Sequence, residues 1–362
     1  MLQNRAMTKT RMWLVAPVFV LASLVFMPQD VRAAAPVRAV ATAPAGKLQG
    51  RVETGLLTFK GTRPALERGV SCTQKPSLSI DSGASDPRPM CEDCHNLNLW
   101  TPRADPATRL PVVVWIRGGA LIFGAGGLPT CDGTPLAQRA AVLVTINHRL
   151  GTLGFFAHPS IAAAQPDADV NFGLLDQIAA LRWVRQNIAA FGGDPGSVTI
   201  FGQSAGAESL PALFTSPLAK GLFQKGIAQS QYGIPSHTLT QARATAAQVA
   251  TALQLNGAPA TAADLHAVPA EAFEKLDANE LSLAPGFIVG DPARPKPILE
   301  VFQSGGEAPV PRNAAAWPRD SQRDSMLLEF GEADGVRADF MKARVHAFVG
   351  TPKVMGVFTA VC

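Results

Sequence analysis

Two short runs of the sequence are apolar at almost every position and predict buried strands. Residues 111–116 read Pro-Val-Val-Val-Trp-Ile, and residues 141–146 read Ala-Val-Leu-Val-Thr-Ile. A strand that is apolar on both faces is typical of a parallel sheet that is covered on both sides. Shorter apolar runs at 198–201 and 226–229 predict a third and a fourth strand of the same sheet.

Between these strands the apolar period changes to that of a helix. Over residues 171–191 the apolar positions lie on one stripe, with spacings of four, three, three and four: Leu174, Ile178, Leu181, Val184 and Ile188. The Gly-Gly-Asp-Pro segment at 192–195 predicts the end of that helix. Strands that alternate with helices predict an α/β fold, with a mainly parallel central sheet flanked by helices.

The region before residue 111 has a weaker pattern. Residues 34–46 are rich in Ala and Pro and predict an unstructured lead-in. The alternation over 47–59 predicts a hairpin at the edge of the sheet. Residues 60–90 are poor in apolar side chains and rich in Pro, Ser and Gly, so we expect a loop there.

Composition narrows the class of protein. The chain has 362 residues, of which 47% are hydrophobic and 17% are charged, so it can bury a sizeable core and wholesale disorder is excluded. The net charge of +4 is small for this length. Because the sequence has neither a basic run nor a nucleic-acid-binding motif, we expect no nucleic-acid partner.

The N-terminus predicts export. Arg5, Lys9 and Arg11 precede a largely apolar stretch at 12–27, and small residues follow at 33–35. This order is typical of a secretory signal peptide, here residues 1–33 with cleavage near Ala33, which leaves a domain at 34–362. The alternative is an uncleaved membrane anchor, but the stretch is short for a span of about 20 residues. We therefore expect an exported protein, periplasmic or secreted, with no stable membrane span after cleavage.

The cysteines suit an oxidising compartment. There are five, so at least one is free or pairs with another chain: Cys72, Cys91, Cys94, Cys131 and Cys362. The Cys-x-x-Cys pair of Cys91 and Cys94, with His95 beside it, is a possible metal or redox motif. The sequence has no second Cys-x-x-Cys pair and no pair of histidines at ligand spacing, so we expect neither a metal nor another cofactor.

A serine lies where the third strand meets the next helix. Residues 202–206 read Gly-Gln-Ser-Ala-Gly, directly after the apolar run that ends at Phe201. A sharp strand-to-helix turn forces such a serine into a strained backbone and lifts its hydroxyl above the sheet. The flanking glycines leave room where a side chain would clash. The alternative, a helix N-cap serine, explains neither glycine, so we predict that Ser204 is a nucleophile.

A serine nucleophile that attacks a carbonyl also needs donors for the developing oxyanion. The backbone N–H of Ala205 is one donor by its position in the turn. Gly118 and Gly119 follow the strand that ends at Ile116 and offer two more, because glycine lets the backbone approach a substrate closely. The alternative for the two glycines is an ordinary turn.

Together these motifs resemble the type-B carboxylesterases, which include bacterial para-nitrobenzyl esterases and the cholinesterases. The resemblance covers roughly residues 72–302. It rests on ordered matches along the chain: Glu92-Asp93-Cys94, Leu97-Asn98-Leu99-Trp100, Trp115-Ile116 with Gly118-Gly119-Ala120, Asn147, Arg149-Leu150-Gly151, Gly154-Phe155-Phe156, Asn171 to Gln177, Phe191 to Pro195, and Phe201 to Gly206.

The resemblance implies an α/β-hydrolase fold and hydrolysis of carboxylic esters, with a small-molecule ester as substrate, through an acyl-serine on Ser204. It implies oxyanion donors at Gly118, Gly119 and Ala205. It also implies a disulfide from Cys94 to an upstream cysteine, for which Cys72 is the match. Arg149 and Asp176 resemble a buried structural ion pair of the family.

The sequence departs from the family in several places. Arg117 stands where many relatives have His before the two glycines, and His148 and His95 replace a Tyr and a Leu. These two histidines are interpreted as structural substitutions. Beyond Pro311, residues 312–362 match the family poorly.

That poorly matched segment is where the family places its catalytic acid and histidine. Asp324 is the best match for the acid, and Glu329 is the next. His346 is the only histidine after the acid region, and its setting differs from that of the family's histidine. His237 and His266 come too early for the order serine, acid, histidine. The sequence therefore predicts no secure catalytic histidine.

Two hypotheses follow for the chain as a whole. The first is an active, exported serine esterase, which these motifs do not distinguish from a lipase. The second is a catalytically impaired relative, with a binding role or none, whose coding sequence is truncated or frame-disturbed after about Pro311 and whose sheet is incomplete at its C-terminal edge.

Overall fold

The computed structural model describes residues 38–61, 67–74, 89–164, 170–229, 236–276, 286–303, 313–314 and 325–329. The predicted signal peptide at 1–33 lies outside these residues, and so do Asp324 and His346. Among the described residues, no helix combines the length and the apolar character needed to cross a bilayer.

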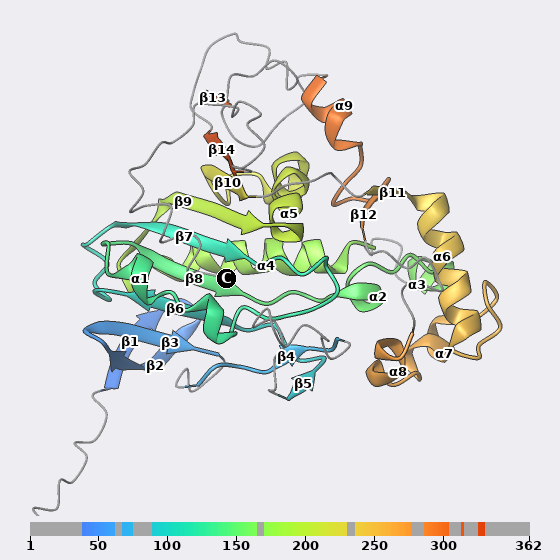
Figure 1. The fold of residues 1–362 in the computed structure, drawn as a ribbon, viewed down its shortest axis with the longest axis horizontal. Coiled ribbons are helices and arrows are strands. Elements are labelled where there is room, and N and C mark those ends of the chain that lie inside the picture. Colours follow the sequence, from blue (N-terminus) through green and yellow to red (C-terminus); the bar gives the residue numbers. More distant parts are fainter. Residues whose placement is uncertain are drawn as a thin grey trace, which may run out of the picture. The chain divides into compact units, whose positions relative to one another are not determined.

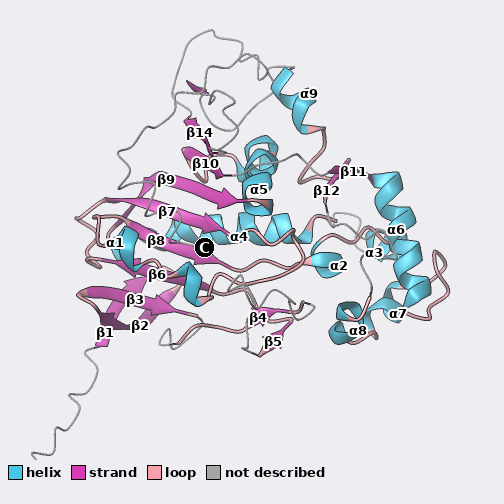
Figure 2. Ribbon diagram, viewed as in Figure 1, coloured by secondary structure: helices cyan, strands magenta, loops and turns pink. Residues whose placement is uncertain are grey.

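The central element is a mixed sheet (Figures 1 and 2). Within the described residues it has ten strands, in the order β1-β2-β3-β6-β8-β7-β9-β10-β14-β13. Their bounds in that order are Arg38–Ala43, Gly46–Glu53, Leu56–Lys60, Leu97–Thr101, Val142–Ile146, Leu110–Ile116, Gly193–Gln203, Lys225–Gln229, Ser325–Glu329 and Asn313–Ala314. Two further pairs lie outside this sheet: β4 (Ser71–Cys72) with β5 (Met90–Cys91), and β11 (Ser236–Thr238) with β12 (Phe287–Val289).

Parallel pairing is confined to the middle of the sheet. Strands β8, β7, β9 and β10 are parallel neighbours, and every other pair in the large sheet is antiparallel. These are the four strands that the apolar runs predicted. The prediction of a parallel sheet is therefore confirmed for this part of the molecule. β2 and β3 pair in the antiparallel direction because a tight turn joins them, in which Thr54 and Gly55 both have positive φ (50° and 79°).

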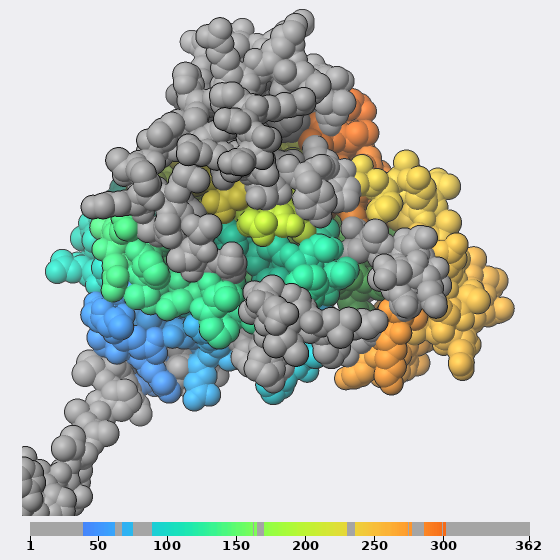
Figure 3. Space-filling model, in the orientation of Figure 1, coloured from blue at the N-terminus to red at the C-terminus, as the bar shows by residue number. Residues whose placement is uncertain are grey.

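Helices cover both faces of the parallel strands. The α-helices are α1 (Thr134–Ala137), α2 (Gly151–Gly154), α3 (Pro159–Ala164), α4 (Phe172–Asn187), α5 (Ala205–Thr215), α6 (Leu239–Ala252), α7 (Ala262–His266), α8 (Ala270–Glu274) and α9 (Ile298–Gln303). The described residues also include the 3₁₀ turns η2 (Pro129–Cys131), η3 (Ile188–Phe191) and η4 (Pro217–Ala219). Figure 3 shows the segment from α6 onward, yellow to orange, to one side of the sheet strands.

Alternation along the strands divides the core in two. On β7, Val112, Val114 and Ile116 face the cluster that contains α4 and α5. Trp115, between them, faces a second cluster formed with η2 and α1. From Val114 to Ile116 the strand is therefore buried on both faces, which explains its run of apolar residues.

The Ala- and Pro-rich lead-in was predicted wrongly in part, because residues 38–43 form the edge strand β1. Ala39, Ala41 and Ala43 are buried, whereas Val40 between them is 49% exposed. The alternation is present, but it uses alanine as the inward residue. A small side chain suits the close approach of this strand to η3, and composition alone did not predict it.

A buried polar cluster ties the segment after β12 to the start of α4. The Asp291 carboxylate accepts hydrogen bonds from the backbone N–H groups of Val170 and Arg294 and from the Asn171 amide. The Arg294 side chain is 1% exposed and lies over the Phe287 ring. Its Nε and Nη1 atoms have no hydrogen-bond partner in the part of the chain that the structure describes. Burial lowers the pKa of Arg294 to about 10, against the opposite effect of the Asp291 charge.

We expect Arg294→Met to raise the free energy of unfolding by about 1–3 kcal/mol, because a buried charge without hydrogen bonds is replaced by an apolar chain of similar length. The measurement is urea denaturation at pH 7. The control is Lys296→Met on the same segment, where the side chain is 56% exposed and little change is expected. A loss of stability in Arg294→Met larger than that of the control would contradict the prediction.

Candidate active site

Ser204 occupies the sharp turn between β9 and α5. Its backbone has φ 54° and ψ −126°, a conformation that a residue with a side chain rarely adopts. The Ser204 N–H donates to the Gln229 carbonyl at the end of β10 (2.9 Å), and the Ser204 carbonyl accepts from the Glu208 N–H (3.0 Å). The turn is therefore held from the neighbouring strand and from the helix, and the serine is partly exposed.

The two glycines around Ser204 are required by packing. A Cβ at Gly202 would lie 2.5 Å from the Gly206 carbonyl oxygen and 2.7 Å from the Ile116 carbonyl oxygen. A Cβ at Gly206 would collide with the same Ile116 oxygen and would lie 2.8 Å from the Arg117 carbonyl oxygen. Helix α5 therefore begins in direct backbone contact with the end of β7, which places the serine beside the loop that follows β7.

That loop carries the two predicted oxyanion glycines. A Cβ at Gly118 would lie 2.6 Å from the Gln203 carbonyl oxygen and 3.2 Å from the Ser204 Cβ. Gly119 has φ 104°, and its carbonyl accepts from the N–H groups of Ile122 and Phe123 (2.9 and 3.2 Å). The loop thus turns back on itself directly beside the serine.

The amides around Ser204 are available to a ligand. Within the described residues, the N–H groups of Gly118, Gly119 and Ala205 donate no hydrogen bond. Ala205 is the first residue of α5, where a helix leaves its N–H groups without an internal partner and carries partial positive charge. Such a set of donors suits an oxygen that acquires negative charge.

Arg117 lies beneath this loop. Its side chain is 6% exposed, donates from Nη1 to the Phe123 carbonyl, and lies over the Phe123 ring at 5.9 Å. Side chains at Gly119 or Gly124 would collide with its guanidinium. The residue that replaces the histidine of many relatives therefore packs inside the loop, a role that the sequence did not predict.

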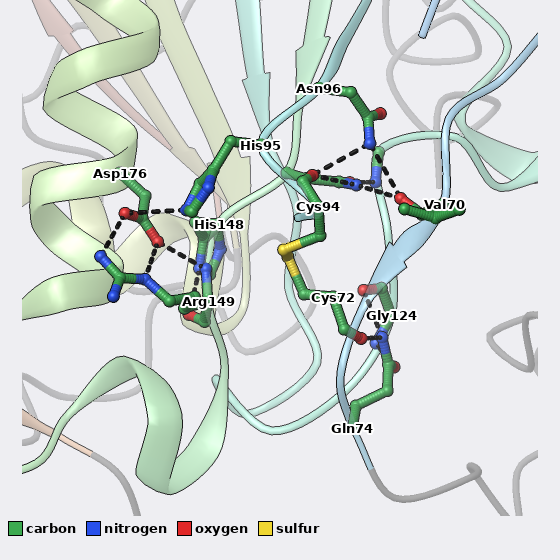
Figure 4. The surroundings of a disulfide bond; sticks show 12 residues. Val70, Cys72, Gln74, Cys94, His95, Asn96, Gly124, His148, Arg149 and Asp176 are labelled. Carbon is green, nitrogen blue, oxygen red and sulfur yellow. Dashed lines mark hydrogen bonds and ion pairs between the residues drawn. A yellow bond between two sulfur atoms is a disulfide. The ribbon is translucent and has the colours of Figure 1, made fainter. Parts of the chain in front are cut away.

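A disulfide braces the loop from the outside (Figure 4). Cys72 and Cys94 are bonded, as the resemblance implies, and Cys91 is an exposed free thiol. Gln74 follows the bridge and donates to the Cys72 and Gly124 carbonyls (2.9 and 3.0 Å). Because Cys94 is bonded to Cys72, the Cys-x-x-Cys motif holds no pair of free thiols.

The expected ion pair is present at the start of α4. Asp176 accepts from the Arg149 N–H (2.8 Å), Nε (2.9 Å) and Nη2 (2.8 Å), and from His95 Nε2 (3.1 Å). Although burial acts to raise it, these bonds from His95 and Arg149 hold the pKa of Asp176 well below its usual range. Burial lowers the pKa of neighbouring His148, whose Nδ1 hydrogen-bonds the Arg149 carbonyl.

Among the described residues, no candidate for the catalytic acid or base is hydrogen-bonded to the Ser204 side chain. Glu329 ends β14, where it pairs with Lys225, and its side chain is not described. Among the described histidines, none hydrogen-bonds Ser204. His266 is exposed on α7, and His237 is partly exposed on β11. Asp324 lies outside the described residues and stays a prediction, and His346, which the sequence did not support as the base, lies outside them too.

Comparison with known proteins decides the family. The model of the family described as "Carboxylesterase family" matches residues 40–290, which is more than half of the chain. This chain belongs to the carboxylesterase family. Its parallel strands, strand-to-helix turn and Ser204 all lie within the matched residues.

Several relatives of this carboxylesterase-family chain are named esterases. Para-nitrobenzyl esterase of Bacillus subtilis is 41% identical over 271 residues, covering 68% of this chain and 53% of that protein. Fumonisin B1 esterase of Sphingopyxis macrogoltabida is 41% identical over 206 residues, covering 56% and 38%. Among solved structures, a thermophilic PNB esterase gives a TM-score of 0.67 at 34% identity, covering 76% of this chain and 62% of that one.

A carboxylesterase of Geobacillus stearothermophilus also matches, with a TM-score of 0.65 at 30% identity, covering 76% of this chain and 60% of that one. These two structures confirm the predicted α/β-hydrolase fold. The chain spans about half or less of the length of the curated relatives it matches: 38% of the fumonisin esterase and 53% of the para-nitrobenzyl esterase.

Proposed function

We propose that this carboxylesterase-family chain is a serine hydrolase that cleaves carboxylic esters through an acyl-serine at Ser204. The observation that carries the proposal is the strained turn at φ 54°, with Gly118 packed against the serine Cβ. In this proposal the hydroxyl faces the N–H groups of Gly118, Gly119 and Ala205, which donate to no described residue. The named esterases among its relatives support the same reaction class.

In this proposal the Ser204 Oγ attacks the ester carbonyl carbon while its proton passes to a general base. The carbonyl oxygen becomes an anion held by the N–H groups of Gly118, Gly119 and Ala205. Collapse of this intermediate breaks the bond to the alcohol oxygen, which leaves as the protonated alcohol. Water then attacks the acyl-serine by the same steps and releases the acid and Ser204. Loss of one such donor typically costs about a hundredfold to a thousandfold in rate.

The proposed reaction also needs a general base and an acid partner for that base. We retain Asp324 as the proposed acid, because it is the best match to the family at that point of the sequence. No residue is proposed as the base. If no group performs that role, the oxyanion donors alone leave only about 10³–10⁴-fold over water, which is the impaired-relative alternative.

The test separates the nucleophile from the turnover. The purified chain is incubated with a fluorophosphonate probe, and the labelled peptide is identified by mass spectrometry. We expect a single adduct on Ser204, because a phosphonyl oxygen occupies the same donor set as the oxyanion. Ser204→Ala should stay unlabelled, while the control Ser236→Ala, at an exposed position on β11, should label like the unaltered chain. An unlabelled but folded chain would count against an activated serine.

The proposed substrates are small, fairly apolar carboxylic esters. This class is supported by the relative named para-nitrobenzyl esterase. A comparison of dissolved short-chain p-nitrophenyl esters with emulsified triglyceride separates esterase from lipase. The proposal predicts faster turnover of the dissolved ester.

The proposed location is outside the cytoplasm, after removal of residues 1–33 from a single hydrolase domain at 34–362. The basic-apolar-small order of the N-terminus supports it, and the Cys72–Cys94 disulfide suits an oxidising compartment. Mass spectrometry of the protein exported by a bacterial host should find a mature N-terminus at Ala34. A mature protein that begins at Met1 would contradict this proposal.

A further inference from the structure

A second site is suggested on the side of α4 that faces away from α5. A cavity of about 480 Å³ lies between this helix, the β1–β2 hairpin and the start of β6. Native interiors leave few voids larger than a water molecule, whereas small-molecule sites occupy about 300–1,000 Å³. The cavity therefore has the size of a ligand site rather than of a packing defect.

The cavity is separate from Ser204. Asp176, Ala180 and Trp183 line it and follow one another at helical spacings of four and three, so they share one stripe of α4. Gln177, on the neighbouring stripe, faces the other way and donates to the Ser209 hydroxyl on α5 (3.1 Å). Helix α4 thus stands between this cavity and the helix that carries the nucleophile turn.

The walls of the cavity are mostly apolar. Leu48, Leu97, Ala180 and Trp183 are partly buried and pack their inner sides against the main core. The Trp183 ring is held at 5.9 Å from the Phe191 ring. A preformed apolar wall with a fixed aromatic ring suits an aryl group or a short alkyl chain.

His95 and Asp176 line one part of the cavity, and Figure 4 shows the contact between these two side chains. The His95 side chain is 45% exposed, and its Nε2 is held by the buried Asp176 carboxylate at 3.1 Å. Each oxygen of Asp176 already accepts two hydrogen bonds, because Arg149 supplies the other three donors. The carboxylate is therefore saturated, which leaves Nδ1 as the His95 ring nitrogen that a ligand could engage.

The amides in this part of the cavity are also engaged. Asn96 and Asn147 each donate from Nδ2 to the Val70 and Cys94 carbonyls. The charged or titratable groups beside His95 are Asp176, Arg149 and the buried His148. Since Arg149 balances the charge of Asp176, a protonated His95 leaves this part of the cavity with one net positive charge. A single carboxylate neutralises it.

We propose that this cavity binds a small monocarboxylate with an aryl or short alkyl body, whose carboxylate accepts a hydrogen bond from His95 Nδ1. The Asp176 carboxylate holds the ring through Nε2, so the position of Nδ1 is fixed in advance of binding. The acid released by ester hydrolysis belongs to this chemical class, but the site is inferred from the cavity alone and its test uses no turnover.

The test is calorimetric titration of the purified full chain with 3-phenylpropionate and, as the matched control ligand, 3-phenylpropan-1-ol. We expect a Kd of about 0.1–1 mM for the acid, as the ligand has few atoms, and binding of the alcohol at least tenfold weaker.

Two variants keep the proposal falsifiable. His95→Leu should weaken binding of the acid about tenfold or more, the usual effect of losing a hydrogen bond to a charged group. Ala180→Phe should block binding by filling the cavity. The control His266→Leu changes an exposed histidine on α7 and should bind like the unaltered chain. Equal affinity for the acid and the alcohol would overturn the proposal, and so would unchanged binding in folded His95→Leu or Ala180→Phe. It would also be overturned if 3-phenylpropionate gave no binding heat at a concentration of about 10 mM, ten times a Kd of about 1 mM.

Discussion

Replacing Ser204 by alanine is expected to lower kcat for a p-nitrophenyl ester by up to about a millionfold, while the folded structure is retained. In a serine protease, loss of the nucleophile alone costs about as much as loss of the whole triad. The oxyanion donors are backbone groups and stay in place, so the variant keeps only their contribution. The measurement is steady-state release of p-nitrophenol at saturating ester.

A second substitution at the same position distinguishes chemistry from strain. Ser204→Gly is expected to be as inactive as Ser204→Ala but more stable than it by about 1–3 kcal/mol, because glycine adopts positive φ without the strain that a Cβ brings at 54°. Urea denaturation of both variants measures this difference. Equal stability of the two would show that the turn is relaxed, and full activity in either would remove Ser204 from the mechanism.

Replacing Asp176 by asparagine is expected to cost about 3–5 kcal/mol of unfolding free energy at pH 7, as is usual when one partner of a buried pair is removed. The lower end of that range is expected, since the Arg149 side chain is 34% exposed and gains some solvation. Asparagine keeps the size of the side chain, so the loss reports the charge. The control is Asp264→Asn, a capping residue at an exposed position on α7.

The same pair predicts a pH dependence of stability. The pKa of Asp176 is depressed in the folded state, so its contribution is present above its unfolded pKa of about 3.9 and is lost as the pH falls below it. The stability difference between the unaltered chain and Asp176→Asn should therefore be larger at pH 7 than at pH 3. A difference that grows on acidification would contradict this assignment.

The elements predicted well are those whose signal is local. The strand at 111–116 and the helix after Asn171 are each specified by an apolar period within one segment. The turn at Ser204 is specified by two glycines, Gly202 and Gly206, that stand two residues before and two residues after the serine. β1 escaped prediction because its inward residues are alanines, which contribute little to an apolar period.

What the sequence determined by itself is the parallel core of the sheet and the glycine-flanked turn at Ser204, because an apolar run and a short motif each lie within one segment of the chain. Only the tertiary structure decided which distant groups meet. His95 reaches Asp176 across 81 positions of the chain, and Arg117 turns inward against Phe123 rather than toward solvent. Such contacts depend on how the strands bring loops together, and no local period encodes them.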